Sequence, residues 1–183
     1  MTTIPNKKEI RNESSEIINV IIEIPKGSDI KYEYDHTSRI LVVDRRLFTA
    51  MYYPCNYGFI PNTLEQDGDP TDILVLGNSS LVPLSLVKVI PIGVLLTEDE
   101  KGVDAKIISV PVPSIDPSFS TVSDINDVPI FLLDQIKHFF EHYKELEKGK
   151  WIKVLGWGSK EEALKKISES IARFKGNELE RTS

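Results

Sequence analysis

Three aspartates lie close together in the stretch Gln66–Asp72, and their spacing could place them around one positively charged ligand. Gly68 allows backbone dihedral angles that are closed to other residues, and Pro70 fixes its own φ, so a sharp turn is predicted here. Carboxylates held this close repel one another unless a cation offsets their charge. Oxygen ligands suit hard divalent ions such as Mg2+ or Ca2+. A solvated acidic turn without a ligand is the alternative, because Asp and Gly are ordinary turn residues. The three carboxylates are those of Asp67, Asp69 and Asp72.

The segments nearest to this turn are predicted to be β-strands. Ile73–Leu76 follows the turn directly and is an apolar run typical of a buried strand. Ile17–Ile24 is rich in β-branched residues, which favour strands, and it contains one acid, Glu23. A lone acid in a strand either faces solvent or faces a charged partner, so Glu23 is a candidate site residue.

Residues 30–46 predict a β-hairpin with charged groups along one face. Ile30–Tyr34 alternates between apolar and polar residues, so Lys31 and Glu33 must share a face. Ile40–Val43 is the second strand, and a charged stretch that includes Arg45 follows it.

A second acidic turn and another strand follow in the middle of the chain. Residues 85–96 predict one bent strand or two, since a proline and a glycine interrupt them. The polar turn 97–102 then leads into a strand at 103–110, where Asp104 and Lys106 share a face.

Two helices are predicted near the end of the chain. Between Pro129 and Gly149, apolar residues recur at steps of three and four, and this periodicity alone places Tyr143 in the core. A short strand at 151–155 follows. A capping-box pattern then begins the second helix at Ser159, and Gly176 is expected to end that helix.

Length and composition indicate a single domain over residues 1–183, with 40% hydrophobic and 27% charged residues. Residues 1–16 are polar and form an expected N-terminal arm, and residues 176–183 are an expected disordered tail. Because the strands come first and the helices last, the fold class is α+β and mostly β, such as an antiparallel barrel with helices packed outside it.

The charge and the cysteine content narrow the class of protein. A formal net charge of −6 argues against a general nucleic-acid binder, which usually has a basic face. No apolar stretch is long enough to cross a bilayer, and Met1–Ser15 lacks the apolar core of a secretory signal. The single cysteine, Cys55, cannot form an internal disulfide, which fits a reducing compartment. We therefore expect a cytoplasmic protein without a membrane partner.

Acids and bases on one side of a β scaffold indicate a site that binds divalent cations together with a multiply charged anion. Phosphate chemistry requires this combination. Metal ions neutralise phosphoryl oxygens and activate a water near neutral pH, while lysine and arginine hold the remaining oxygens. The charged residues that the predicted strands and turns bring to this side are Glu23, Glu33, Asp99, Asp104, Lys31, Arg45 and Lys106.

Three alternatives to this interpretation fit the residues less well. A calcium loop of the EF-hand type needs Gly at its sixth position and Glu at its twelfth, but counting from Asp67 these are Asp72 and Asn78. The segment to Thr71 also resembles the D-x-D-x-T motif of haloacid-dehalogenase-type phosphatases. That motif should follow an apolar parallel strand, whereas polar residues 62–66 precede it here and crossover helices are absent. An OB-like barrel that binds nucleic acid or another anion without turnover gains nothing from so many carboxylates.

The hexapeptide from Asp67 to Asp72 matches the D-[GS]-D-P-x-D signature of the soluble family I inorganic pyrophosphatases, and the chain resembles prokaryotic members of that family. The resemblance extends from about Ile17 to Phe174, with the blocks in the family's order. The other similar blocks surround Glu23, Lys31 and Glu33, Arg45, Tyr53 to Gly58, Asp99 to Lys106, and His138 to Lys144.

The resemblance implies a fold, an activity and partners. The implied fold is an OB-like, five-stranded closed barrel with flanking C-terminal helices. The implied activity is the hydrolysis of pyrophosphate to two phosphates, with several Mg2+ ions in each active site and Mn2+ or Zn2+ as substitutes. By analogy with prokaryotic members of this length, the resemblance also implies a homohexamer.

The matching positions carry the family's roles onto this chain. Asp67, Asp72 and Asp104 would ligate the tightest metal ion, with Asp72 bridging to a second one and Asp69 acting as the general base. The acids that would receive further metal ions are Glu23, Glu33 and Asp99. The side chains that would hold the phosphates are Lys31, Arg45, Tyr57, Lys106, Tyr143 and Lys144, of which Arg45 and Tyr57 are also expected to act in catalysis. The periodicity predicts that Tyr143 lies in the core, whereas the resemblance implies that its hydroxyl reaches the active site.

The chain departs from the family's pattern at three positions outside the proposed ligands. Arg39 and Leu84 stand where the family commonly has glycine, and Ile90 stands where a basic residue sometimes occurs. The absence of glycine at Arg39 affects the predicted geometry of the hairpin turn.

Overall fold

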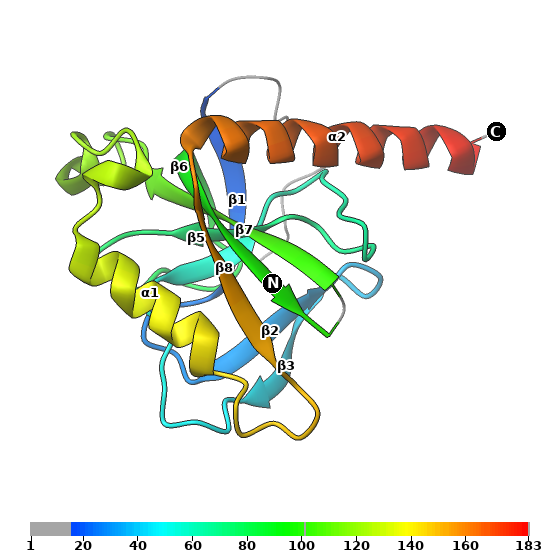
Figure 1. The fold of residues 1–183 in the computed structure, drawn as a ribbon. Helices are drawn as coiled ribbons and strands as arrows, with labels where there is room; N and C mark the ends of the chain where they lie inside the picture. Colours follow the sequence, from blue (N-terminus) through cyan, green and yellow to red (C-terminus); the bar gives the residue numbers. More distant parts are fainter. Residues whose placement is uncertain (1–15, 101, 183) are drawn as a thin grey trace.

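A computed structural model describes residues 16–100 and 102–182, and strands dominate it, with two long helices packed against them (Figure 1). The strands are β1 (Ile18–Ile24), β2 (Ile30–Asp35), β3 (Ile40–Arg46), β4 (Asn56–Phe59), β5 (Asp72–Val75), β6 (Leu86–Asp99), β7 (Gly102–Pro111) and β8 (Ile152–Gly158). The α-helices are α1 (Ile130–His142) and α2 (Lys160–Thr182), and two short 3-10 helices are η1 (Pro117–Phe119) and η2 (Ile125–Asp127). The predicted class, mostly β with the helices late in the chain, is confirmed.

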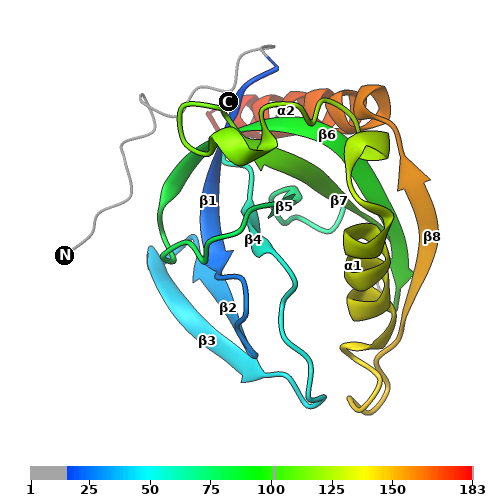
Figure 2. The same ribbon diagram turned by 90° about the vertical axis from the view of Figure 1, so that its left-hand side faces the viewer.

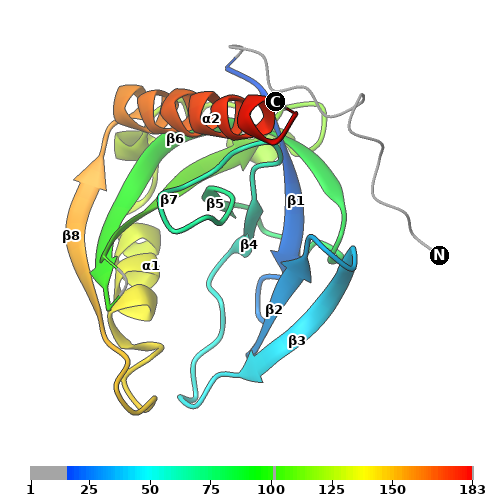
Figure 3. The same cartoon turned by 90° about the vertical axis from the view of Figure 1, so that its right-hand side faces the viewer.

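Five strands form a hydrogen-bonded ring. The order is β1-β4-β5-β7-β6, and a pairing between β1 and β6 closes it, while β8 adds to the outer edge of β6. The pairing is mixed, because β5 and β7 run parallel whereas the other pairs are antiparallel. The predicted hairpin is present as the separate two-stranded sheet β2–β3, on the opposite side of the molecule from β8 (Figures 2 and 3).

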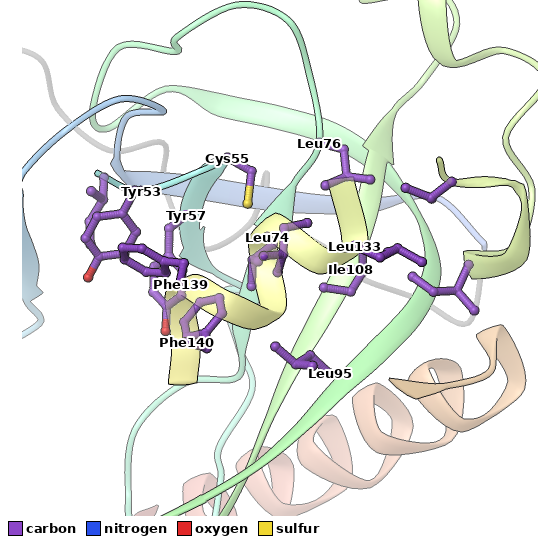
Figure 4. Packing of buried hydrophobic residues seen from close by; sticks show 14 of the residues in the cluster. Tyr53, Cys55, Tyr57, Leu74, Leu76, Leu95, Ile108, Leu133, Phe139 and Phe140 are labelled. Carbon is purple, nitrogen blue, oxygen red and sulfur yellow. The ribbon is translucent and has the colours of Figure 1, made fainter. Parts of the chain in front are cut away.

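Side chains on alternating strand positions fill two separate hydrophobic clusters. In β5, Leu74 packs in a cluster with Phe139 and Phe140 of α1, whereas its neighbour Ile73 packs in a second cluster with Ile167 of α2. Figure 4 shows part of the first cluster, in which Phe139 and Phe140 of α1 lie among side chains of the strands such as Leu74. Burying a side chain of this size contributes on the order of 2–3 kcal/mol, so each helix is held mainly by its apolar face. Both faces of the strand ring are therefore covered.

Two irregularities in strand pairing lie at charged residues of the candidate site. The register of β1 against β4 shifts between Ile22 and Ile24, at Glu23, and the register of β2 against β3 shifts just after Lys31. Such bulges re-aim a side chain relative to regular strand alternation. Nearby, a Cβ atom on Gly58 would lie 1.9 Å from the Ile21 carbonyl oxygen, so only glycine allows β4 to approach β1 this closely.

Helix α1 ends earlier than predicted. It stops at His142 rather than at Gly149, and the chain continues in turns, with the Glu145 and Glu147 amides donating to the His142 and Lys144 carbonyls. In this turn segment Glu147 forms an ion pair with Arg45 of β3, and Lys144 forms one with Asp99 of β6. These tertiary contacts override the helical periodicity. One consequence is that Leu146, which continues the apolar spacing three residues after Tyr143, is 62% exposed.

Helix α2 ends later than predicted. It continues through Gly176 to Thr182, so the prediction that Gly176 ends it was wrong. A glycine within a helix costs about 1 kcal/mol relative to alanine, which a run of helix-forming neighbours can offset. Of the predicted N-terminal arm, residues 1–15 lie outside the described part of the chain. Among the residues described, no helix is long and apolar enough to cross a membrane.

Candidate active site

The Lys106 ammonium group is the centre of a polar cluster at the start of β5, beside the middle of β7. Its Nζ atom lies 2.8 Å from Asp72 Oδ2, 2.8 Å from Asp104 Oδ2 and 3.1 Å from the Tyr57 hydroxyl. The Tyr57 hydroxyl in turn donates a hydrogen bond to Asp72. The parallel pairing of β5 with β7 sets Ile73 opposite Ile107, which brings the residues preceding them, Asp72 and Lys106, side by side. Asp104 and Lys106 share one face of β7, as predicted.

The charge of Lys106 is maintained by its acidic neighbours. Its side chain is buried, and burial by itself would lower the pKa of the ammonium group. Asp104, Asp72 and Tyr57 outweigh that effect and raise the pKa well above its ordinary value, so Lys106 is a cation. Burial also raises the pKa of Tyr57 well above its ordinary value, so its hydroxyl remains a neutral donor.

Tyr143 belongs both to the core and to this cluster. Its ring is 6% exposed and stacks on Phe139, with 5.0 Å between ring centroids and 14° between the ring planes. Burial raises the pKa of Tyr143, while Lys106 and Arg45 act in the opposite direction. The helical periodicity thus correctly predicted that the Tyr143 ring lies in the core. The positive charges of Lys106 and Arg45 nevertheless act on its hydroxyl group.

Glu23 extends the cluster from the side of β1. Its carboxylate accepts a hydrogen bond of 2.7 Å from the Tyr34 backbone amide. The pKa of Glu23 is raised to about 8, mainly by burial, while that hydrogen bond acts in the opposite direction and the negative charge of Asp72 adds to the increase. The lone acid of the first strand therefore has charged neighbours and does not face bulk solvent.

Two ion pairs lie at the margins of the cluster. Lys31 bonds to Glu33 and lies 3.1 Å from Asp44, so the hairpin contributes alternating charges as predicted. Lys144 follows α1 and lies 2.8 Å from Asp99 at the end of β6, with both side chains 12% exposed. The acids and bases of the cluster and its margins thus come from β1, β2, β3, β5, β6, β7 and the segment after α1.

The acidic turn has the predicted sharp geometry. Gly68 has a φ of +93°, the Glu65 amide donates to the Asp69 carbonyl at 2.7 Å, and the Asp69 amide donates to Asp67 Oδ1 at 3.1 Å. Asp67 and Asp69 are exposed on this turn, whereas Asp72 is partly buried beside Lys106. The structure therefore brings Asp72 and Asp104 together at Lys106, while Asp67 and Asp69 lie on the exposed part of the turn. Within residues 16–100 and 102–182, no three Asp, Glu, His or Cys side chains are grouped closely enough to hold one metal ion.

The pair of carboxylates is nevertheless suited to a cation. Asp72 and Asp104 already share one positive charge, the Lys106 ammonium group, at equal distances of 2.8 Å. Carboxylate oxygens are the donors that Mg2+ prefers, and the exposed turn carries further carboxylates next to Asp72 in the chain. The chemistry of the donor set fits a hard divalent ion.

Comparison with known proteins decides the family. The sequence profile described as inorganic pyrophosphatase matches residues 20–175. The inorganic pyrophosphatase of Sulfolobus acidocaldarius is 55% identical over 163 residues, covering 89% of this chain and 94% of that protein. The one from Saccharolobus solfataricus is 57% identical over 158 residues, covering 86% and 92%. The chain belongs to the inorganic pyrophosphatase family.

Solved structures of inorganic pyrophosphatases have a similar fold. The enzyme from Helicobacter pylori superposes with a TM-score of 0.89 at 48% identity, over 93% of this chain and 99% of that one. The structure from Thermus thermophilus has a TM-score of 0.87 at 45% identity, covering 94% and 97%. The prediction that this chain is an enzyme of the inorganic pyrophosphatase family is confirmed.

Two acids of this candidate site were not predicted from the sequence. Glu147 is 9% exposed, and its carboxylate lies 2.9 Å from the Arg45 guanidinium. Asp44 contacts both Lys31 and Arg45. Glu147 did carry a signal, because it lies four residues after Tyr143, on the apolar face of the predicted helix, where an acid needs a partner.

Two departures from the family's pattern fall on unusual backbone conformations. Arg39 has a φ of +57° and Leu84 a φ of +69°, in the left-handed region where glycine is favoured. At both positions the chain therefore has a backbone conformation that glycine adopts most easily, and the side chain present there strains it.

Proposed function

We propose that this protein hydrolyses pyrophosphate to two phosphates and requires Mg2+ to do so. The observation that carries the proposal is the Lys106 cluster, in which Asp72 and Asp104 flank a buried cation. Family membership and the names of the relatives, all inorganic pyrophosphatases, support the choice of substrate. A multiply charged anion bound with divalent ions needs both acids and bases in one place, and this cluster has both.

Metal binding is assigned to the acids of the site. Asp67, Asp72 and Asp104 would hold the tightest ion, and Asp72 would also contact a second one. The acids assigned to ions that arrive with substrate are Glu23, Glu33 and Asp99. When bound, Mg2+ supplies charge neutralisation of the phosphoryl oxygens and makes water more acidic, and Mn2+ or Zn2+ could replace it.

Substrate binding is assigned to the basic and phenolic groups. Arg45 presents a planar guanidinium that can bind two phosphate oxygens at once, and Lys106 offers a buried point charge. Tyr57 has a neutral hydroxyl that donates a hydrogen bond beside them. The remaining groups that hold the phosphates are Lys31, Tyr143 and Lys144. Arg45, Lys106 and Tyr57 stabilise charge that develops as the bridging bond breaks.

Asp69 is the proposed general base, which removes a proton from the attacking water. The fixed φ of the adjacent Pro70 and the backbone bond from Glu65 hold it at the tip of the turn. The variant Asp69→Asn keeps the shape of the side chain but cannot accept that proton. We expect it to bind Mg2+ with unchanged affinity while kcat falls at least about a hundredfold. Turnover at the wild-type rate would exclude Asp69 as the base.

Three finer properties belong to the same proposal. The five-stranded ring is interpreted as an OB-like closed barrel, since the β1–β6 pairing returns the sheet to its first strand. Assembly as a homohexamer is supported by large exposed apolar side chains such as Phe131 and Val82, which subunit contacts would cover. A cytoplasmic location is supported by the buried, unpaired Cys55.

The deciding experiment is a phosphate-release assay with purified protein. With Mg2+, pyrophosphate should be hydrolysed rapidly and a phosphate monoester hardly at all, and chelation of the metal should stop the reaction. Preferential hydrolysis of the monoester would support a haloacid-dehalogenase-type phosphatase. Absence of turnover with Mg2+, Mn2+ and Zn2+ would support an anion-binding module.

A further inference from the structure

The acidic turn is tied to helix α2 by a network of hydrogen bonds that the proposed reaction does not use. The segment between β4 and β5, which contains the turn, lies beneath α2 in Figure 1. On the side before the turn, Arg173 of α2 donates from Nη2 to Glu65 Oε2 and from Nε to the Leu64 carbonyl, both at 2.7 Å. The Leu64 amide also donates to Ser170 of α2, at 3.2 Å.

The side after the turn is tied to the same two helical residues. The Thr71 and Ser170 hydroxyl oxygens lie 2.5 Å apart, and both residues are fully buried. The Thr71 hydroxyl also lies 2.5 Å from Glu65 Oε1, so Glu65 links Thr71 with Arg173. The Thr71 amide donates to the Thr63 hydroxyl at 2.9 Å. Both ends of the turn are thus fixed to α2 and to each other.

The hydrogen-bond network to α2 and the Lys106 cluster meet at two adjacent residues, Thr71 and Asp72. Successive side chains of a strand point to opposite faces, so Thr71 points towards α2 while Asp72 points towards Lys106. A shift of Thr71 would therefore move the Asp72 carboxylate. The backbone bond from the Glu65 amide to the Asp69 carbonyl, 2.7 Å long, transmits the position of Glu65 to the tip of the turn.

We infer that Ser170 and Arg173 are positioning residues, through which α2 limits the movement of the acidic turn and so favours the binding of Mg2+ by its carboxylates. The inference rests on the proposed function, in which this turn supplies metal ligands. Neither residue touches the Lys106 cluster, and their effect passes through Glu65 and Thr71. Because metal binding requires several carboxylates at fixed positions, freedom at the base of the turn lowers affinity for the ion.

The test compares Mg2+ affinity among helix variants. Arg173→Met removes both bonds to the turn, Arg173→Lys restores a positive charge beside Glu65, and Ser170→Ala removes the hydroxyl contact with little change in volume. Lys165→Met is the matched control, because Lys165 lies on the same helix in an exposed pair with Glu169. Calorimetric titration of each protein with Mg2+, without substrate, gives the dissociation constant.

We expect Arg173→Met to weaken Mg2+ binding about fivefold to tenfold, Ser170→Ala about threefold, and Arg173→Lys less than Arg173→Met. Hydrogen exchange at the Gly68 and Asp69 amides of the metal-free protein should accelerate in the same order. Excess Mg2+ should restore most of kcat, and Lys165→Met should match the wild type in every measurement.

Other outcomes separate this inference from the proposed function. If the variants melt at lower temperature but bind Mg2+ and exchange amide hydrogens as the wild type does, Ser170 and Arg173 only anchor the helix and the inference fails. If the wild type binds Mg2+ and hydrolyses pyrophosphate while all variants equal it, the inference alone fails. If the wild type binds no Mg2+, the proposed function fails with it.

Discussion

Arg45 and Glu147 form an ion pair across 102 residues of chain, with 2.9 Å between the Arg45 Nη2 and Glu147 Oε1 atoms. Arg45 Nε also donates to the same oxygen, at 3.0 Å. Two donors of the guanidinium fork are therefore directed at one acid, which fixes the plane of the group. Arg45 is the penultimate residue of β3 and Glu147 lies in the turns after α1, so the pair joins the hairpin to the helical side of the site.

Glu147→Gln should reduce catalysis without unfolding the protein. The amide oxygen can still accept one hydrogen bond, but the charge that orients Arg45 is lost. We expect kcat/KM for pyrophosphate to fall about fivefold to tenfold, equivalent to about 1 kcal/mol. Glu145→Gln is the control, since Glu145 pairs with His142 on the exposed side of the same segment. Equal kcat/KM values for the two variants would show that Glu147 does not orient Arg45.

Lys106→Met should destabilise the metal-free protein, because the Asp72 and Asp104 carboxylates then repel each other without a cation between them. Removing one partner of a buried ion network costs about 3 kcal/mol, so the metal-free variant should melt roughly 6–12 °C below the wild type. Mg2+ should raise the melting temperature of the variant more than that of the wild type, because no ammonium group competes for Asp72 and Asp104. Differential scanning calorimetry with and without Mg2+ measures both effects. Lys88→Met, at an exposed lysine of β6, is the control, and an equal Mg2+ response in both variants would contradict the prediction.

Much of this site was predictable because its residues lie in short local patterns. The alternation in β2 placed Lys31 and Glu33 on one face, and the spacing of Asp104 and Lys106 did the same for β7. Pairings between distant segments were not predictable from such patterns. The parallel register that sets Asp72 beside Lys106 depends on how β5 and β7 meet, and no local residue specifies that. The end of α1 was mispredicted for the same reason, since tertiary contacts of Glu147 override the local periodicity.

The metal-free protein should lose stability as pH rises from about 4.5 to 8, owing to Glu23. Its pKa is raised from 4.5 in the unfolded chain to about 8 in the folded state, mainly by burial. Below pH 4.5 both states are protonated, so no penalty applies. Between these values the unfolded chain releases the proton and the folded protein keeps it, which favours unfolding. Each unit of pKa difference is worth about 1.4 kcal/mol, so the loss reaches several kcal/mol.

Urea unfolding at pH 5 and pH 8, with a chelator present, measures this loss for the wild type and for Glu23→Gln. The variant has no proton to release, so its free energy of unfolding should fall less over the same interval. Excess Mg2+ should also reduce the pH dependence of the wild type if Glu23 contributes to metal binding. Identical pH dependence in the two proteins would mean that Glu23 titrates normally in the folded state.

Arg39→Gly should stabilise the protein, which is unusual for an arginine-to-glycine change. Arg39 is exposed and has a φ of +57°, a conformation that costs a residue with a Cβ atom about 1 kcal/mol but is open to glycine. The greater flexibility of glycine in the unfolded chain offsets part of that gain, which leaves about 0.5 kcal/mol. Urea unfolding at one pH gives the free energy of unfolding. Ser38→Gly is the control, because Ser38 precedes Arg39 in the same exposed turn without a positive φ, and that variant should be destabilised. A loss of stability in Arg39→Gly comparable to that in Ser38→Gly would show that the left-handed conformation at Arg39 carries no strain.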